Sequence, residues 1–269
     1  MSFMQHITRF SLLLGAFVLL GGAEIAPGQA IMAFAAQVKA SPLSSKLSDY
    51  AVSKLDDFET TMKAVYHDDN AARKINNDIG MLYQLKGDVL IRYKEENKFR
   101  ADGKLGASKA SLVINDARQT YSLAGFGIKQ TTNMGKAPGK RKSLLDVGLI
   151  SEYYLGYAQG EFLGEKPFEG VQCAVFKITY KDRSLDTSHR IVWIDPKTKI
   201  TLKREEYAQE GSGGKLRSIW LYREPVEIVS GLFFPSRIEL LNNENKKAGE
   251  TSYSNTRVNV GLHDDIFRL

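Results

Sequence analysis

The chain has 269 residues, a formal net charge of +6 and a single cysteine, Cys173. One cysteine excludes an internal disulfide and a cysteine-rich zinc site, and the apolar neighbours of Cys173 indicate a place in the core. The basic excess is spread along the chain apart from residues 136–142, whereas a nucleic-acid interface would be denser and interleaved with aromatic side chains. We therefore expect no nucleic-acid partner, and weak attraction to anionic lipid stays open.

The first residues have the pattern of a secretory signal. Arg9 precedes a short apolar run over residues 10–20, and small residues follow. This is the order of a charged region, an apolar region and a cleavage zone, and the run is shorter than the ~20 apolar residues of a membrane-spanning helix. We expect export and cleavage near Ala35 or Ala40, with an uncleaved N-terminal anchor as the alternative.

The remainder is expected to form one domain. Residues 41–269 contain no Pro- or Ser-rich linker, and all-β domains of this length are often single. The predicted division is therefore a signal and short flank over residues 1–40 and a single domain over residues 41–269.

Residues 41–70 are predicted to form a helix. Ser41 and Pro42 resemble an N-cap followed by proline at the first helical position. Apolar residues then recur at a spacing of three or four: Leu47, Ala51, Leu55, Phe58, Met62 and Val65. Such a helix would bury its apolar stripe against a sheet.

Short strands are predicted from residue 81 to residue 123. Residues 87–94 alternate apolar and polar side chains, as a half-buried strand does. Further strands are expected at residues 97–103, 111–115 and 120–123. Residues 125–141 are rich in Gly, Thr and Lys without a clear period, which predicts a mobile loop of the kind that often carries function.

A second helix is predicted over residues 143–157. Its apolar residues cover more than one face, which indicates burial on more than one side: Leu144, Leu145, Leu149, Ile150, Tyr153, Tyr154 and Tyr157. It is interpreted either as an ordinary core helix or as a lid over an apolar opening.

From Gly170 onward the sequence predicts consecutive hairpins. Residues 190–195 and 201–207 flank a turn that begins with Asp195 and Pro196, two residues that favour turns. Further strands are expected at residues 171–180, 216–223, 232–242 and 250–260. Strands joined by Gly- and Asn-containing turns indicate a meander. The predicted fold class is therefore α+β, dominated by one curved antiparallel sheet.

No motif indicates catalysis. None of the four histidines has a second ligand at i+3 or i+4, and the sequence lacks the G-x-S-x-G, GxGxxG and phosphate-loop patterns. Glu205 and Glu206 are adjacent in a predicted strand, so they face opposite sides, whereas Arg204 and Glu206 form a plausible structural pair on one face. We expect no metal, no cofactor and no enzymatic activity.

The C-terminal residues resemble a known family. The resemblance rests on these features in order: Trp193-Ile194-Asp195, the turn, residues 202–207, Phe234-Pro235, residues 237–242, residues 249–251, residues 258–260 and Asp265-Ile266-Phe267. This order resembles the LolA-like superfamily of periplasmic lipoprotein carriers, in its outer membrane lipoprotein-sorting branch. The likeness covers roughly residues 170–269.

The resemblance implies an incomplete, strongly curved antiparallel β-barrel whose open side is covered by the N-terminal helix and the second apolar helix. It further implies a periplasmic carrier that shelters acyl chains of lipids or lipoproteins, with a membrane-bound donor or acceptor protein as a further candidate partner. Hiding an acyl chain from water is worth ~0.8 kcal/mol per CH₂ group. Strand alternation and the second helix give the candidate cavity-lining residues: Val89, Ile91, Tyr93, Leu149, Tyr153, Phe176, Ile178, Trp193, Trp220 and Ile238.

Two other functions stay open at this point. The sheet of an envelope structural or sensor protein would present a face to a protein partner. An enzyme would pair carboxylates across strands, and this is the least favoured reading.

Overall fold

The computed structural model describes residues 42–76, 83–95, 97–135 and 142–268. The predicted signal sequence and its cleavage sites lie outside these residues. Residues Leu43–Leu269 form one compact unit. Within the described part of the chain, no helix has both the length and the apolar character needed to cross a membrane.

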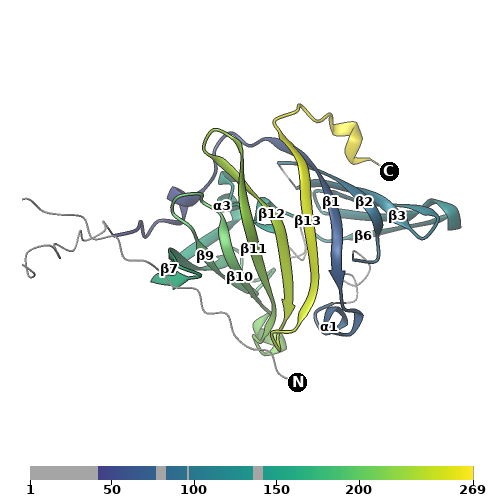
Figure 1. Cartoon of the computed structure of the whole chain (residues 1–269). Coiled ribbons are helices and arrows are strands. Elements are labelled where there is room, and N and C mark those ends of the chain that lie inside the picture. Colours follow the sequence, from purple (N-terminus) through teal and green to yellow (C-terminus); the bar gives the residue numbers. More distant parts are fainter. Residues whose placement is uncertain (1–41, 77–82, 96, 136–141, 269) are drawn as a thin grey trace, which may run out of the picture. The chain divides into compact units, whose positions relative to one another are not determined.

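One antiparallel sheet of thirteen strands dominates the described residues (Figure 1). Its strands are β1 (Asp57–His67), β2 (Lys86–Lys94), β3 (Lys98–Leu105), β4 (Ser108–Asn115), β5 (Arg118–Leu123), β6 (Ile128–Asn133), β7 (Ala158–Phe168), β8 (Val171–Tyr180), β9 (His189–Ile194), β10 (Thr201–Tyr207), β11 (Leu216–Val229), β12 (Leu232–Asn242) and β13 (Lys247–Val258). The spatial order is β6-β5-β4-β3-β2-β1-β13-β12-β11-β10-β9-β8-β7. The sheet thus consists of a first meander, β1–β6, and a second meander, β7–β13, joined where β1 pairs with β13.

The sheet is strongly curved but not closed. Strands β6 and β7 follow one another in the sequence, yet they form the two opposite edges of the sheet. The chain between them crosses the inner face, and it carries two short helical elements: the 3-10 helix η4 (Leu144–Val147) and the helix α3 (Glu152–Tyr157). The predicted curved, incomplete barrel is confirmed in this coarser form.

The remaining helical elements are short. They are η1 (Leu47–Tyr50), α1 (Asp69–Arg73), η2 (Ala124–Phe126), η5 (Glu210–Ser212) and η6 (Asp264–Phe267), where η denotes a 3-10 helix. Helix α1 packs against β12 and β13 at one end of the sheet. Helix η6 lies on the outer face, where Phe267 packs on Val113 of β4 and Asp264 bonds Lys94 of β2 at 2.7 Å.

Most predicted strands are confirmed. Strands β8, β10 and β12 have the predicted bounds, and β2 to β5 differ from prediction by a few residues. Strand β11 runs on to Val229, six residues beyond its predicted end. The clearest signal is in β2, where buried and partly exposed side chains alternate from Val89 onward.

The predicted N-terminal helix is wrong. Residues 57–67 form β1, and only η1 is helical before it. Phe58 and Met62 are four residues apart, and this spacing places them on one face of a helix or on one face of a strand. The β-branched Thr60 between them favours the strand, and Lys54 adopts a left-handed φ of 61°, which ends any helix before β1.

The second predicted helix is also wrong as one continuous element. Gly148 interrupts it with a φ of 80°, and Leu149 and Ile150 continue without helical structure to α3. A Cβ at Gly148 would lie 2.9 Å from the Tyr222 ring, so this position requires glycine for both conformation and space. The N-caps Ser143 and Ser151 start the two short helical pieces separately.

Two further differences concern the edges of the sheet. Residues 128–133 of the predicted mobile loop form β6, which pairs with β5, and residues 136–141 lie outside the described part of the chain. Strand β7 was not predicted, because Gly160, Gly164 and Pro167 weaken its pattern. Proline and glycine are tolerated there because β7 is an edge strand.

Candidate functional site

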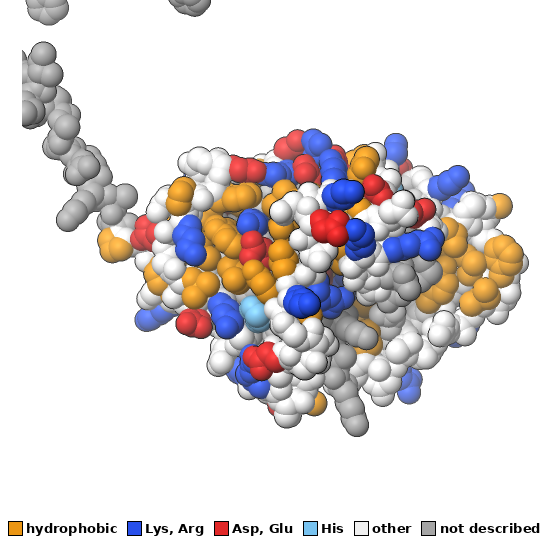
Figure 2. Space-filling model, turned by 90° about the horizontal axis from the view of Figure 1, so that it is seen from below, with side chains coloured by type: hydrophobic (Ala, Val, Ile, Leu, Met, Phe, Trp, Pro, Cys, Tyr) orange, Lys and Arg blue, Asp and Glu red, His pale blue; other side chains and the backbone are white. Residues whose placement is uncertain are grey.

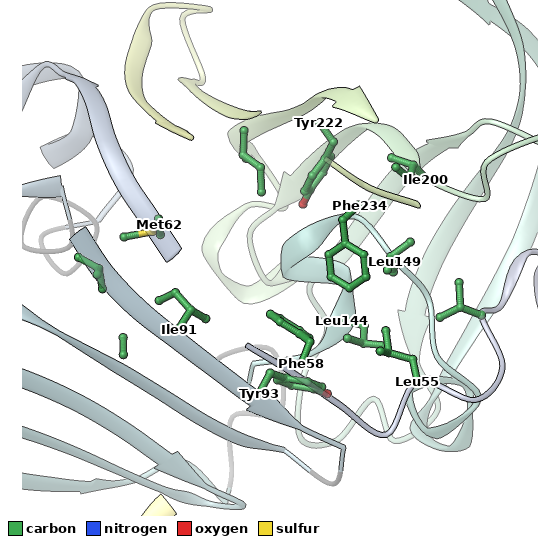
Figure 3. Close-up of a cluster of buried hydrophobic side chains, with 14 residues drawn as sticks. Leu55, Phe58, Met62, Ile91, Tyr93, Leu144, Leu149, Ile200, Tyr222 and Phe234 are labelled. Atoms are coloured by element: carbon green, nitrogen blue, oxygen red, sulfur yellow. The ribbon is translucent and has the colours of Figure 1, made fainter. Parts of the chain in front are cut away.

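The inner face of the sheet carries a large group of buried apolar side chains, called the central cluster (Figure 3). Its buried members are Val52, Leu55, Phe58, Met62, Val89, Ile91, Tyr93, Ala101, Leu144, Leu149, Ile200, Tyr222, Phe234 and Ile238. The Phe58 ring lies 5.4 Å from the Tyr93 ring and 5.3 Å from the Phe234 ring. Phe58 thus links the first meander to the second.

Two irregular segments, residues 43–55 and 142–157, cover this face and are called the cover segments. Leu144 and Leu149 contribute fully buried side chains to the central cluster. The cover segments pair with one another, because the Val52 amide donates to the Ile150 carbonyl at 2.7 Å. Neither segment contributes a strand to the sheet, so the apolar face is closed by short helical elements and the irregular chain between them.

A few polar bonds attach the cover to the second meander. Arg204 Nη1 donates to the Leu145 carbonyl at 2.7 Å, and the Tyr222 hydroxyl donates to the same oxygen at 2.8 Å. The Thr201 amide donates to the Gly148 carbonyl at 2.8 Å. These bonds place η4 over the central cluster.

Charged side chains lie on the inner face beside the apolar cluster. Glu206 is 3.4 Å from Arg204 Nη2 and 3.6 Å from Arg190 Nε, and it accepts a hydrogen bond from Ser218 Oγ at 3.0 Å. Arg190 Nη1 donates to the Tyr180 hydroxyl at 2.6 Å. The predicted pairing of Arg204 with Glu206 on one face is confirmed.

The two guanidinium groups determine the charge state of Glu206. Burial alone would raise the pKa of Glu206, but Arg204 and Arg190 outweigh it and lower the pKa to about 2. Glu206 therefore stays ionised at neutral pH.

Seen from below, hydrophobic side chains gather in two areas of the surface, and one area contains an acidic and a basic side chain (Figure 2).

The structure brings six of the ten candidate lining residues together. Val89, Ile91, Tyr93, Leu149 and Ile238 belong to the central cluster, and Trp220 packs against it. Phe176 and Ile178 belong to a second apolar cluster with Leu145, Ile150, Tyr154, Val192 and Ile194. This second cluster occupies the inner face of β8 and β9.

Two candidate residues lie elsewhere. Trp193 faces the opposite side of the sheet from Val192 and Ile194, and Lys203 Nζ lies 4.3 Å from its ring. Tyr153 lies on α3 with 39 % of its surface exposed. The binding role of all ten residues stays a prediction.

Sequence reasoning missed Arg190 as a neighbour of Glu206, and it missed the bond from Arg190 to Tyr180. Arg190 opens a strand after a polar loop, where an arginine usually faces solvent. The alternation of Arg190 with Val192 and Ile194 was the available signal, because it places Arg190 on the inner face.

This architecture, a curved and unclosed antiparallel sheet with a covered apolar face, is the LolA-like fold. A domain described as an outer membrane lipoprotein-sorting protein domain, from Vibrio parahaemolyticus, is 13% identical with a TM-score of 0.53, over 83% of this chain and 96% of that one. A LolA superfamily protein from Nitrosomonas europaea is 15% identical with a TM-score of 0.52, over 83% and 94%. A DUF1329 family protein from Desulfovibrio piger is 12% identical with a TM-score of 0.50, over 82% and 92%.

Sequence comparisons are less specific. A family model described as "Uncharacterized protein" matches residues 139–269. No curated protein matches the sequence.

Proposed function

We propose that this protein binds acyl chains of lipids or lipoproteins beneath its cover segments and carries them in the cell envelope without catalysing a reaction. The observation that carries the proposal is the central cluster, an apolar inner face closed by irregular segments. The signal-like N-terminal sequence supports the envelope location.

The energetics of the cover favour such a role. Lifting residues 144–149 would break the bonds to the Leu145 and Gly148 carbonyls, at a net cost of ~0.5–1.5 kcal/mol each. It would also expose the apolar surface beneath Leu144 and Leu149, and an acyl chain in their place would restore ~0.8 kcal/mol for each buried CH₂ group. The free energy gained by burying an acyl chain therefore offsets the free energy lost when the cover lifts.

The inner face is not sealed at the first meander. Phe99 of β3 and Leu112 of β4 pack against the central cluster while remaining partly exposed. These residues give an acyl chain a path to the buried part of the face. The similar folds of the Vibrio parahaemolyticus and Nitrosomonas europaea proteins add support, since the former is described as a lipoprotein-sorting domain.

Organic extraction of the purified protein followed by lipid mass spectrometry tests the proposal, together with titration by a fluorescent fatty acid. We expect a bound acyl lipid and an affinity that Leu112→Arg lowers at least tenfold. Leu90→Arg is the matched control, because Leu90 is also partly exposed but lies between Val89 and Ile91 and so faces the other side of β2. An absence of acyl ligand, or equal losses in the two variants, would defeat the proposal.

A further inference from the structure

A pocket of about 400 Å³, called the seam pocket, lies between the residue that follows β6 by two positions, the helix α3 and the end of β8. Gly135, just after β6, contributes to its wall, and so do Tyr153 and Tyr157 of α3. Tyr180 at the end of β8 and the adjacent Lys181 line it as well. Its volume lies within the range of small-molecule sites.

Aromatic rings form much of the seam pocket. The Tyr157 ring lies 5.8 Å from the Tyr153 ring at 72° and 6.2 Å from the Tyr180 ring at 7°. Tyr157 also packs against the second apolar cluster. Its ring therefore lies between the pocket and this cluster.

Two side chains that line the pocket carry hydrogen-bond donors: Lys181, which is exposed, and Tyr180, whose hydroxyl is buried against Arg190. Lys181 Nζ donates to the Leu155 carbonyl at 2.8 Å and to the Gly156 carbonyl at 3.0 Å, and the ammonium group has a third N–H. The Tyr180 hydroxyl accepts from Arg190 Nη1 at 2.6 Å, so its own proton can be donated elsewhere. Burial raises the pKa of Tyr180, which keeps that proton in place.

Arg190 strengthens the second donor. Its positive charge polarises the Tyr180 O–H, and hydrogen bonds in such a chain reinforce one another. Hydrogen bonds to an ionised acceptor are also shorter and stronger than neutral ones. Lys181 and Tyr180 together therefore favour an anion over a neutral group.

One carboxylate opposes this preference. Asp182 lines the same pocket, and its Oδ1 accepts hydrogen bonds from the Ser184 amide at 3.0 Å and the Ser184 hydroxyl at 2.6 Å. These bonds lower the pKa of Asp182 and hold its carboxylate toward Ser184. We expect Asp182→Asn to strengthen anion binding.

We propose that the seam pocket binds the anionic head group, a carboxylate or a phosphate, of the same amphiphile whose acyl chain enters the apolar interior. This inference rests on the proposed acyl-binding function. It adds a head-group preference and assigns that preference to Lys181 and Tyr180.

The test compares ligands that share one chain length and differ in head group. Dodecanoate, dodecyl phosphate, dodecanol and dodecyltrimethylammonium are titrated calorimetrically, below their micelle concentrations, into the full chain. We expect both anions to bind at least tenfold more tightly than dodecanol. Lys181→Met and Tyr180→Phe should each reduce this ratio below threefold.

Lys177→Met is the control, because Lys177 lies on β8 with its side chain on the opposite face from Phe176 and Ile178, and it removes the same charge. Circular dichroism verifies that each variant is folded. Equal affinities for all four ligands, tighter binding of dodecyltrimethylammonium, or equal effects of Lys181→Met and Lys177→Met would overturn the inference.

Two further outcomes separate this inference from other accounts. Inorganic phosphate alone is titrated as well, and an affinity equal to that of dodecyl phosphate would overturn the head-group assignment in favour of a free-anion site. If no dodecyl ligand binds, the acyl-binding function itself has failed and the head-group assignment falls with it. If dodecanol binds and the anions bind no better, only the head-group assignment is lost.

Discussion

The two meanders of the sheet use their inner faces differently. In the second meander, Phe176 and Ile178 are completely buried, and the cover segments are bonded to this half. In the first meander, Phe99 and Leu112 remain partly exposed, and Ile128 of β6 is 47 % exposed. Under the proposed function, Phe99, Leu112 and Ile128 are the apolar surface that a ligand contacts first, and the second meander anchors the cover.

Replacing one phenylalanine in each meander tests this contrast and should produce the largest changes in the free energy of unfolding. Phe176→Ala should lower the free energy of unfolding by about 4 kcal/mol, because the cavity left in a sealed region cannot be filled by solvent. Phe99→Ala should cost about 1–2 kcal/mol, since part of that ring is already exposed. Chemical denaturation measures both, and equal losses would show that the two inner faces are equally sealed.

Removing the polar attachment of the cover should have the next largest effect. Arg204→Met leaves Glu206 with one guanidinium neighbour and removes a hydrogen bond to the Leu145 carbonyl. We therefore expect the free energy of unfolding to fall by about 3 kcal/mol. The variant should also speed up backbone amide hydrogen exchange more at residues 144–150 than in β1 to β4. Unchanged exchange in the cover would argue that Arg204 stabilises only the second meander.

The double variant Arg204→Met/Glu206→Gln separates the two contributions. Its stability should recover in part, because no ionised carboxylate then lacks a partner. The exchange in the cover should stay fast, because the bond to the Leu145 carbonyl is still missing.

Glu206 should also make the free energy of unfolding depend on pH, and this effect is expected to be smaller. The pKa of Glu206 falls from an ordinary value of 4.5 to about 2 in the folded protein. The stabilisation is therefore complete above pH 4.5 and is lost as the pH falls toward 2. Glu206→Gln should flatten the decline of stability between about pH 5 and pH 2, as measured by denaturation at each pH. An unchanged slope would contradict the role of the two arginines.

Strands were predictable from the sequence where apolar side chains recur at every second position. In β8 the apolar residues Ala174, Phe176 and Ile178 recur at every second position and share the inner face, which made this strand predictable. The prediction failed at β1, where Phe58 and Met62 satisfy helical and strand spacing alike. The prediction also failed at β7. This strand lies at the edge of the sheet, and its apolar side chains do not recur at every second position.

The candidate site was only partly predictable for a related reason. Val89, Ile91 and Tyr93 were assigned correctly to the inner face, since a single strand fixes their common direction. Trp193 was predicted to line the cavity, but it alternates with the inward-facing Val192 and Ile194 and so lies on the outer face. The charges of Arg190 and Glu206 are balanced by residues on other elements, and such pairs depend on the tertiary structure.

The two tryptophans of the chain allow a direct test of ligand binding to the inner face. Trp220 packs against the central cluster, whereas Trp193 lies on the outer face beside Lys203. In the Trp193→Phe variant, the emission of Trp220 should change as dodecanoate is added and should saturate at the affinity measured by calorimetry. In the Trp220→Phe variant, the emission of Trp193 should stay constant. A response from Trp193 with none from Trp220 would contradict acyl binding on the inner face.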